Sequence, residues 1–170
     1  MKRIRFLAVL SAVLGAVLSV AIGVVLGFGA GVQTASAQLS GTHIYSDPSK
    51  AKAELATALK TASATHKRIL LDFGGNWCPD CQALDIYFHD NKNRVLLEAN
   101  YILVHINIGH MDQNEDLAER YEIPLKRGVP ALAVLSDNGQ LLYSQKGGEF
   151  EAMRHLESSD VTHFLIKWKP

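Results

Sequence analysis

The pattern of hydrophobic and polar positions predicts alternating strands and helices along most of the chain. Residues 69–73 and 101–108 are short apolar runs rich in Ile, Leu and Val, which is typical of buried strands. Residues 131–136 and 141–145 are two further strands, and the polar stretch between them contains Asn138-Gly139, a strong hairpin signal.

Helical patterns occupy the segments between the strands. Asp47-Pro48 is a helix start with proline at the first helical position, and the amphipathic helix that follows covers residues 49–62. The other predicted helices cover residues 79–90 with a continuation over 94–99, then 114–121, 149–157 and 160–168.

The order of these elements predicts an α/β fold. Residues 69–108 form a strand–helix–strand unit, whose strands are parallel and whose crossover is nearly always right-handed. The closing hairpin adds antiparallel strands, so we expect a mixed sheet with helices on both faces.

The amino terminus departs from this globular pattern. Lys2, Arg3 and Arg5 precede an uncharged stretch over residues 6–33, and small residues at 35–37 match a signal-peptidase site. Cleavage would leave a chain beginning at Gln38. Uncleaved, residues 6–33 are long enough to anchor the protein in a membrane, since spanning takes about 20 apolar residues.

Both alternatives imply export, because the basic end stays inside. We therefore divide the chain into a signal peptide or amino-terminal membrane anchor (residues 1–37), a linker (38–47) and a folded domain (48–170). The domain is expected to be periplasmic, either soluble or tethered to the inner membrane.

Composition supports one globular domain. The 170 residues are 48% hydrophobic and 20% charged, which provides enough apolar material for a core. The formal net charge is zero, so the sequence carries no electrostatic signature of a nucleic-acid partner.

The chain contains two cysteines, Cys78 and Cys81, at the start of a predicted helix. A bridge between them closes too small a loop to constrain the unfolded chain much. Unpaired N–H groups and the positive end of the helix dipole stabilise an anion there, so Cys78 is expected to ionise readily. Cys81 lies one turn on and can resolve a mixed disulfide at Cys78.

Four other interpretations of the pair stay open at this point. Zinc normally needs four ligands, and the chain has no second cysteine pair, although His89 follows Cys81 by eight residues. A redox-linked copper-binding chaperone could use Cys78, Cys81 and a histidine, because soft thiolates suit cuprous copper. The pair could also be unreactive core cysteines, or an idle motif in a structural module.

Several motifs together resemble the thioredoxin family. They are Leu71-Asp72-Phe73, Trp77-Cys78-Pro79-Asp80-Cys81, Gly128-Val129-Pro130, Asn138-Gly139 and Gly147, in the family's order. The resemblance covers residues 68–170 and is closest to periplasmic thioredoxin-like proteins and the soluble domains of transmembrane disulfide reductases.

The resemblance implies a thioredoxin fold, with a central mixed four-stranded sheet flanked by helices on both faces. It also implies a thiol–disulfide oxidoreductase, most simply a disulfide reductase, that needs no cofactor. Its partners would be disulfide-bonded protein substrates and an upstream thiol electron donor such as a membrane disulfide reductase.

Roles for individual residues follow from the resemblance. Pro130 is expected to be cis and to place Val129 beside the cysteines, where the Val129 backbone can pair with a substrate peptide. Trp77 would shield one side of the pair. Asp72 matches the family's buried acid, a proton acceptor for Cys81.

Three positions are expected to tune the site. Pro79 suits the first helical turn. Asp80 places an anion near Cys78 and should oppose thiolate formation, which predicts a comparatively reducing protein. His105 falls where the family often has lysine, and we expect it to contact Asp72; an ordinary core or surface histidine is the alternative.

The sequence also departs from the family. Gly74 replaces a large aromatic residue, which predicts a more open cleft, and Ile86 replaces a helix-kinking proline, which predicts a straighter helix. The segment over residues 109–127 is longer than usual. Lys126-Arg127 at its end either contacts substrate or belongs to a solvated loop.

Overall fold

The computed structural model of the protein describes residues 43–170. The predicted signal peptide or anchor (1–37) and the first half of the predicted linker (38–42) lie outside the described residues. Among those described, no helix is both long and apolar enough to cross a membrane.

The described domain is built around a four-stranded mixed sheet in the order β2-β1-β3-β4. Its strands are β1 (Arg68–Gly74), β2 (Tyr101–Asn107), β3 (Ala131–Leu135) and β4 (Leu141–Ser144). β1 is parallel to β2 and antiparallel to β3, and β3 is antiparallel to β4. The predicted mixed sheet and closing hairpin are therefore confirmed.

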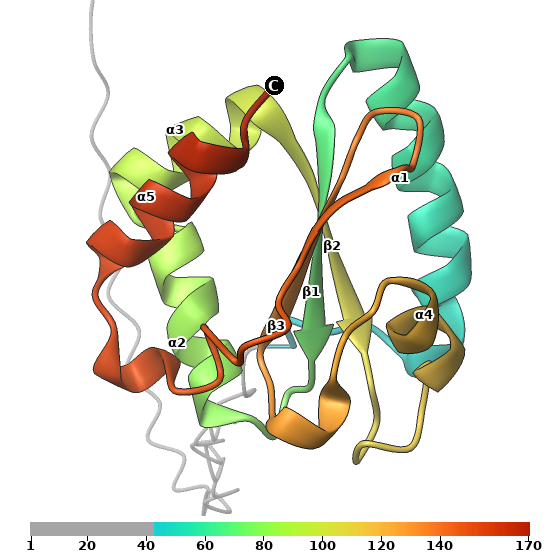
Figure 1. Cartoon of the computed structure of the whole chain (residues 1–170), viewed down its shortest axis with the longest axis vertical. Coiled ribbons are helices and arrows are strands. Elements are labelled where there is room, and N and C mark those ends of the chain that lie inside the picture. The colour runs from blue at the N-terminus through green and yellow to red at the C-terminus, as the bar shows by residue number, and fades with distance from the viewer. Residues whose placement is uncertain (1–42) are drawn as a thin grey trace, which may run out of the picture. The chain divides into compact units, whose positions relative to one another are not determined.

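Helices cover both faces of the sheet, as Figure 1 shows: α1 and α4 lie on one side, and α2, α3 and α5 on the other. These helices are α1 (Ala51–Thr65), α2 (Pro79–Phe88), α3 (Asn91–Asn100), α4 (Glu115–Arg120) and α5 (Ser158–Trp168). Side chains alternate along a strand, so Leu71 and Phe73 pack in the core on the α1 side while Leu70 packs on the α2 side.

The first helix begins as the sequence predicts. The Asp47 carboxylate accepts a 2.9 Å hydrogen bond from the backbone N–H of Ser49 and caps a 3₁₀ turn, Pro48–Lys50, that continues into α1. The helix ends at Thr65, three residues beyond the predicted end, because His66 adopts a left-handed conformation with φ of 55°.

α2 and α3 are separate helices, whereas the sequence predicts that the second continues the first. Asp90 has an extended backbone with ψ of 139°, which breaks the helix and starts α3 at Asn91. The side chain of Asn93 then joins three elements: its amide N–H groups reach the carbonyl oxygens of Tyr87 and Ser158, and its oxygen accepts from Thr162 at 2.6 Å.

The prediction of a helix over residues 149–157 is wrong. Only a 3₁₀ turn, Met153–His155, forms there, because Phe150 and Met153 both insert into the core from a segment that folds over the start of α2. A reciprocal capping box between Glu157 and Asp160 then begins α5, two residues before its predicted start.

The end of the predicted linker belongs to the domain. Tyr45 is 1% exposed and packs in the core, so residues 43–47 are part of the folded unit.

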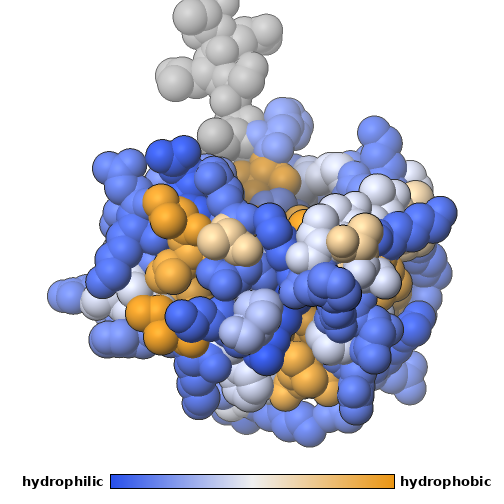
Figure 2. Space-filling view, turned by 90° about the horizontal axis from the view of Figure 1, so that it is seen from above, coloured by the Kyte–Doolittle hydropathy of each residue, from blue (hydrophilic) through white to orange (hydrophobic). Residues whose placement is uncertain are grey.

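At the opposite end of the sheet, where β1 begins and the chain ends, the surface is mostly hydrophilic with separate hydrophobic areas (Figure 2).

Replacing Asn93 with Ala is expected to lower the free energy of unfolding by about 2–3 kcal/mol, because the fully buried Asn93 side chain loses its hydrogen bonds to the carbonyl oxygens of Tyr87 and Ser158 and to the hydroxyl of Thr162. Urea denaturation measures the change. Asn91 is an exposed residue of the same type in the same helix, and Asn91→Ala should change stability by no more than about 0.5 kcal/mol. Equal losses in the two variants would contradict this account of Asn93.

Candidate active site

The two cysteines lie at the junction between β1 and α2. Gly74 ends the strand, a turn carries the chain to Cys78, and Cys78 is the N-cap of α2. Its sulfur accepts a hydrogen bond of 3.1 Å from the backbone N–H of Cys81, and the two sulfurs form a disulfide with 5.2 Å between the Cα atoms. Pro79 occupies the first helical turn, where its missing N–H costs nothing.

Cys78 is less accessible than the sequence predicts. In the disulfide form Cys78 is 3% exposed and Cys81 is fully buried, so the expectation of an open sulfur at the helix tip is wrong for this form. Trp77 lies beside it and is 45% exposed; its indole N–H donates to the carbonyl oxygen of Gly109, and its ring stacks on His110. A partner therefore has to reach a residue that is almost completely covered in this form.

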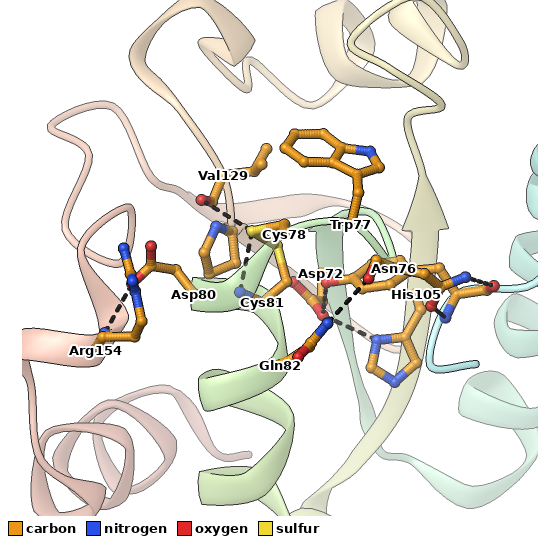
Figure 3. Close-up of a disulfide and its surroundings, with 12 residues drawn as sticks. Asp72, Asn76, Trp77, Cys78, Asp80, Cys81, Gln82, His105, Val129 and Arg154 are labelled. Atoms are coloured by element: carbon orange, nitrogen blue, oxygen red, sulfur yellow. Dashed lines mark hydrogen bonds and ion pairs between the residues drawn. A yellow bond between two sulfur atoms is a disulfide. The ribbon is translucent and has the colours of Figure 1, made fainter. Parts of the chain in front are cut away.

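The peptide bond between Val129 and Pro130 is cis, as expected. The carbonyl oxygen of Val129 lies 3.5 Å from the sulfur of Cys78, which brings the loop before β3 to the cysteines (Figure 3). A buried residue that the sequence reasoning missed supports this loop: Gln145 accepts from the N–H of Leu132 and donates to the carbonyl oxygen of Pro130. Its predicted position as the last residue of the strand over 141–145 gave no signal of this role.

Asp72 lies in the middle of β1 and is 1% exposed. Its Oδ2 atom accepts two hydrogen bonds, one of 2.7 Å from the hydroxyl of Tyr45 and one of 2.9 Å from Nδ1 of His105. The predicted contact between His105 and Asp72 is thus confirmed, and it follows from the sheet register, which pairs these two residues on neighbouring strands. The sequence reasoning did not identify Tyr45.

The carboxylate shifts the titration of both partners. Burial by itself lowers the pKa of His105, but the hydrogen bond to Asp72 and the negative charge there outweigh burial and raise the pKa above its usual value. Burial raises the pKa of Tyr45 well above its usual value, and the charge of Asp72 adds to this effect. Tyr45 therefore stays a neutral hydrogen-bond donor at physiological pH.

The sequence predicts that Gly74 makes the cleft more open, and this prediction is wrong. A Cβ atom at this position would lie 2.4 Å from the hydroxyl oxygen of Tyr45 and 2.7 Å from the sulfur of Cys81. The aromatic ring of Tyr45, from the segment before α1, fills the space that the absent side chain leaves. Glycine is needed here because of this close approach.

Asp80 is held by an arginine from a distant segment. Its Oδ1 accepts a 2.8 Å hydrogen bond from the backbone N–H of Arg154 and a 3.0 Å bond from Nε of the same residue (Figure 3). Partial burial alone would raise the pKa of Asp80, but the bonds to Arg154 outweigh it and lower the pKa. The anion that the sequence predicts near Cys78 is therefore present, but it is paired with the cation of Arg154.

The remaining departures from the family lie at the surface. Ile86 is 67% exposed on α2, which runs without interruption from Pro79 to Phe88. Lys126 and Arg127 are exposed in a 3₁₀ turn, Leu125–Arg127, that leads directly to Gly128 and the cis peptide bond. Contact of this basic pair with substrate stays a prediction.

Residues 43–170 contain no group of three or more His, Cys, Asp or Glu side chains arranged to hold a metal ion. Cys78 and Cys81 instead form a pair with no further ligand of these types gathered around them in the described part of the chain. The arrangement is that of a redox disulfide at a helix start.

Comparison with known proteins agrees with this geometry. A family described as thioredoxin-like matches residues 50–136, about half of the chain. The chain belongs to the thioredoxin-like family. It is a thiol–disulfide oxidoreductase with a Cys-x-x-Cys active site, and its mixed four-stranded sheet with flanking helices is a thioredoxin-like fold.

Individual relatives are moderately similar. A thioredoxin of Buchnera aphidicola is 31% identical over 101 residues, covering 59% of this chain and 81% of that protein. The thiol:disulfide interchange protein DsbD of Pseudomonas fluorescens is 27% identical over 121 residues, which are 70% of this chain but 19% of that longer protein. A crystal structure described as a disulphide isomerase of Xylella fastidiosa has 34% identity and a TM-score of 0.70, covering 74% of this chain and 95% of that one.

Replacing Tyr45 with Phe removes the hydroxyl that donates to the buried Asp72, and the oxidised protein is expected to lose about 2 kcal/mol of stability in urea denaturation. Tyr121 offers a matched control, since its buried hydroxyl has no hydrogen-bond partner among the described residues. Tyr121→Phe should leave stability unchanged or raise it slightly. A Tyr45→Phe variant as stable as the wild type would show that this hydrogen bond contributes nothing.

Proposed function

We propose that the protein is an exported disulfide reductase that works through a dithiol/disulfide cycle at Cys78 and Cys81. The observation that carries the proposal is the position of the Cys78 sulfur, which caps α2 and accepts the N–H of Cys81. A thiolate in that position is stabilised by the helix end, so Cys78 is the attacking sulfur.

The cycle has two exchange steps. The Cys78 thiolate attacks one sulfur of a substrate disulfide, forms a mixed disulfide and releases the other substrate sulfur as a thiolate. Cys81 gives its proton to the carboxylate of Asp72 and attacks the Cys78 sulfur, which breaks the mixed disulfide and releases the reduced substrate. An upstream thiol donor then reduces the Cys78–Cys81 disulfide. Burial of Cys81 protects the resolving sulfur from other reactants.

The cis-proline loop gives the substrate a docking edge. Val129 lies against the Cys78 sulfur through its carbonyl oxygen, so an extended peptide lying beside this residue brings its own cysteine to Cys78. Trp77, exposed on the other side, offers an apolar surface to the same peptide. Backbone pairing would make recognition tolerant of substrate sequence.

The contacts of Cys78 support a reducing rather than an oxidising role. Within residues 43–170, its sulfur accepts a hydrogen bond from one backbone N–H and from no cationic side chain, and the nearby Val129 carbonyl oxygen carries partial negative charge. Weak stabilisation of the thiolate lowers the tendency of the disulfide to take electrons. The Asp80–Arg154 pair makes the effect of Asp80 smaller than the sequence suggests, but it adds no net positive charge.

The amino-terminal segment over residues 1–37 supports export. The basic start, the uncharged stretch over residues 6–33 and the small residues before Gln38 have the order of a signal segment. The similarity to a protein named for thiol:disulfide interchange is consistent with partner proteins that exchange thiols and disulfides with this one. A periplasmic location of the domain is part of the proposal.

Cys81→Ser, expressed as the full chain in its host, is expected to accumulate mixed disulfides through Cys78, because the resolving thiol is missing. Nonreducing electrophoresis followed by mass spectrometry identifies the trapped proteins, and they should be exported proteins. Cys78→Ser is the control and should trap none. Trapping of only cytoplasmic proteins would contradict export, and trapping of none would contradict the reductase cycle.

Equilibration with glutathione tests the direction of electron flow, and the wild-type disulfide should be harder to reduce than that of glutathione. Asp80→Asn removes an anion and frees Arg154 beside the helix start, so its equilibrium should shift toward the dithiol by roughly 3- to 10-fold. Arg154→Gln leaves Asp80 unpaired and should shift the equilibrium the other way. A strongly oxidising wild type, or equal shifts in both variants, would refute the assignment.

A further inference from the structure

His105 connects the buried carboxylate to the protein surface. Asp72 is 1% exposed and has no direct path to solvent, whereas the side chain of His105 is 21% exposed. Nδ1 of His105 lies 2.9 Å from Oδ2 of Asp72, and the second ring nitrogen points away from the carboxylate (Figure 3). One nitrogen of the ring therefore contacts the buried acid while the other faces outward.

The two oxygens of Asp72 have different surroundings. Oδ2 accepts from both Tyr45 and His105, whereas Oδ1 is buried without any partner among the described residues. The hydroxyl of Tyr45 and the sulfur of Cys81 meet at the point where a Cβ of Gly74 would lie. The hydroxyl that donates to Asp72 thus also lies near the sulfur of Cys81, and the carboxylate keeps one oxygen without a partner among the described residues.

A surface pocket lies on the outer side of His105. Its lining also includes His43, Ile44, Asp85 and His89, and its volume is about 280 Å³, enough for several water molecules. Asp85 and His89 come from α2 and the turn after it, and Asp85 lies within 3.4 Å of Nδ1 of His89. His105 therefore lines a pocket large enough to hold water, and its side chain is partly open to solvent.

We propose that His105 is the proton exit of the active site, a positioning residue that exchanges the proton of Cys81 with solvent without exposing Asp72. In the resolving step, the S–H bond of Cys81 breaks and an O–H bond forms on Asp72. Asp72 is then neutral and no longer stabilises the positive charge of the doubly protonated His105 ring. The Nε2–H bond of His105 therefore breaks, and this proton passes to water in the pocket. When a thiol donor reduces the disulfide, Cys81 recovers its proton from Asp72, and His105 takes one from water.

The charges around His105 favour this exchange. The groups that face the ring are the acids Asp72, Asp85 and Glu54, the neutral hydroxyl of Tyr45, and the histidines His43 and His89. Against the effect of burial, the hydrogen bond to Asp72 and the charges of these acids raise the pKa of His105 and so favour a protonated ring. Loss of the nearest of these charges, on protonation of Asp72, is the change that releases the proton.

The inference rests on the thiol–disulfide exchange of the proposed function, and one experiment separates the two. Reduced protein is mixed with dithiobis-nitrobenzoate, which releases one coloured thiolate when Cys78 attacks and a second when Cys81 resolves. His105→Asn keeps an N–H at the position of Nδ1 but cannot exchange a proton. We expect an unchanged first release and a second release slowed about 10-fold.

The pH profile distinguishes proton exchange from a structural role. Below about pH 6.5, the ordinary pKa of histidine, the wild-type ring holds its releasable proton, so the deficit of His105→Asn should be largest there. The deficit should shrink as the pH rises through the raised pKa of His105, where the wild-type ring also becomes neutral. Added imidazole should restore part of the second-step rate in His105→Ala.

His89→Asn is the matched control, since His89 lines the same pocket without contacting Asp72. Its second release should equal that of the wild type. Equal second-step rates in His105→Asn and wild type, or an equal deficit in His89→Asn, would overturn the inference. Absence of the first release in the wild type would instead overturn the proposed reductase chemistry.

Discussion

The architecture of the active site depends on one hydrogen bond, the bond from the backbone N–H of Cys81 to the sulfur of Cys78. It makes a cysteine the cap of α2, so the same contact that starts the helix also favours negative charge on the reactive sulfur. The helix can begin there only because β1 ends at a glycine and a short turn follows. Reactivity and helix initiation are therefore properties of the same few atoms.

A buried acid is the second constraint, because a carboxylate in a dry interior is costly unless it is hydrogen-bonded. The domain offsets part of this cost at Oδ2, where a tyrosine from the amino-terminal segment and a histidine from the neighbouring strand both donate to Asp72. The other oxygen has no partner among the described residues, so the cost of burying this carboxylate is only partly offset.

Much of the fold could be predicted from the chain itself. The apolar runs gave the four strands, Asn138-Gly139 gave the hairpin, and Asp47-Pro48 gave the start of the first helix. The prediction over residues 149–157 failed because its helical periodicity was overridden by the burial of Phe150 and Met153 in the core. Local patterns specify an element only where tertiary packing does not require another conformation.

The sequence alone determined the chemistry, since two cysteines three residues apart, a following proline and a Val-Pro pair before a strand are local signals. The contact of His105 with Asp72 was predicted from the family resemblance, because His105 falls where the family often has lysine, and the parallel register of β1 and β2 does pair the two residues. Only the tertiary structure decided which distant groups complete the site: Tyr45 fills the space at Gly74, Arg154 pairs with Asp80, and Gln145 supports the cis-proline loop. These contacts join residues from 13 to 74 positions apart in the chain. Such pairs depend on how the loops close in space, and no periodicity or spacing in the sequence records that.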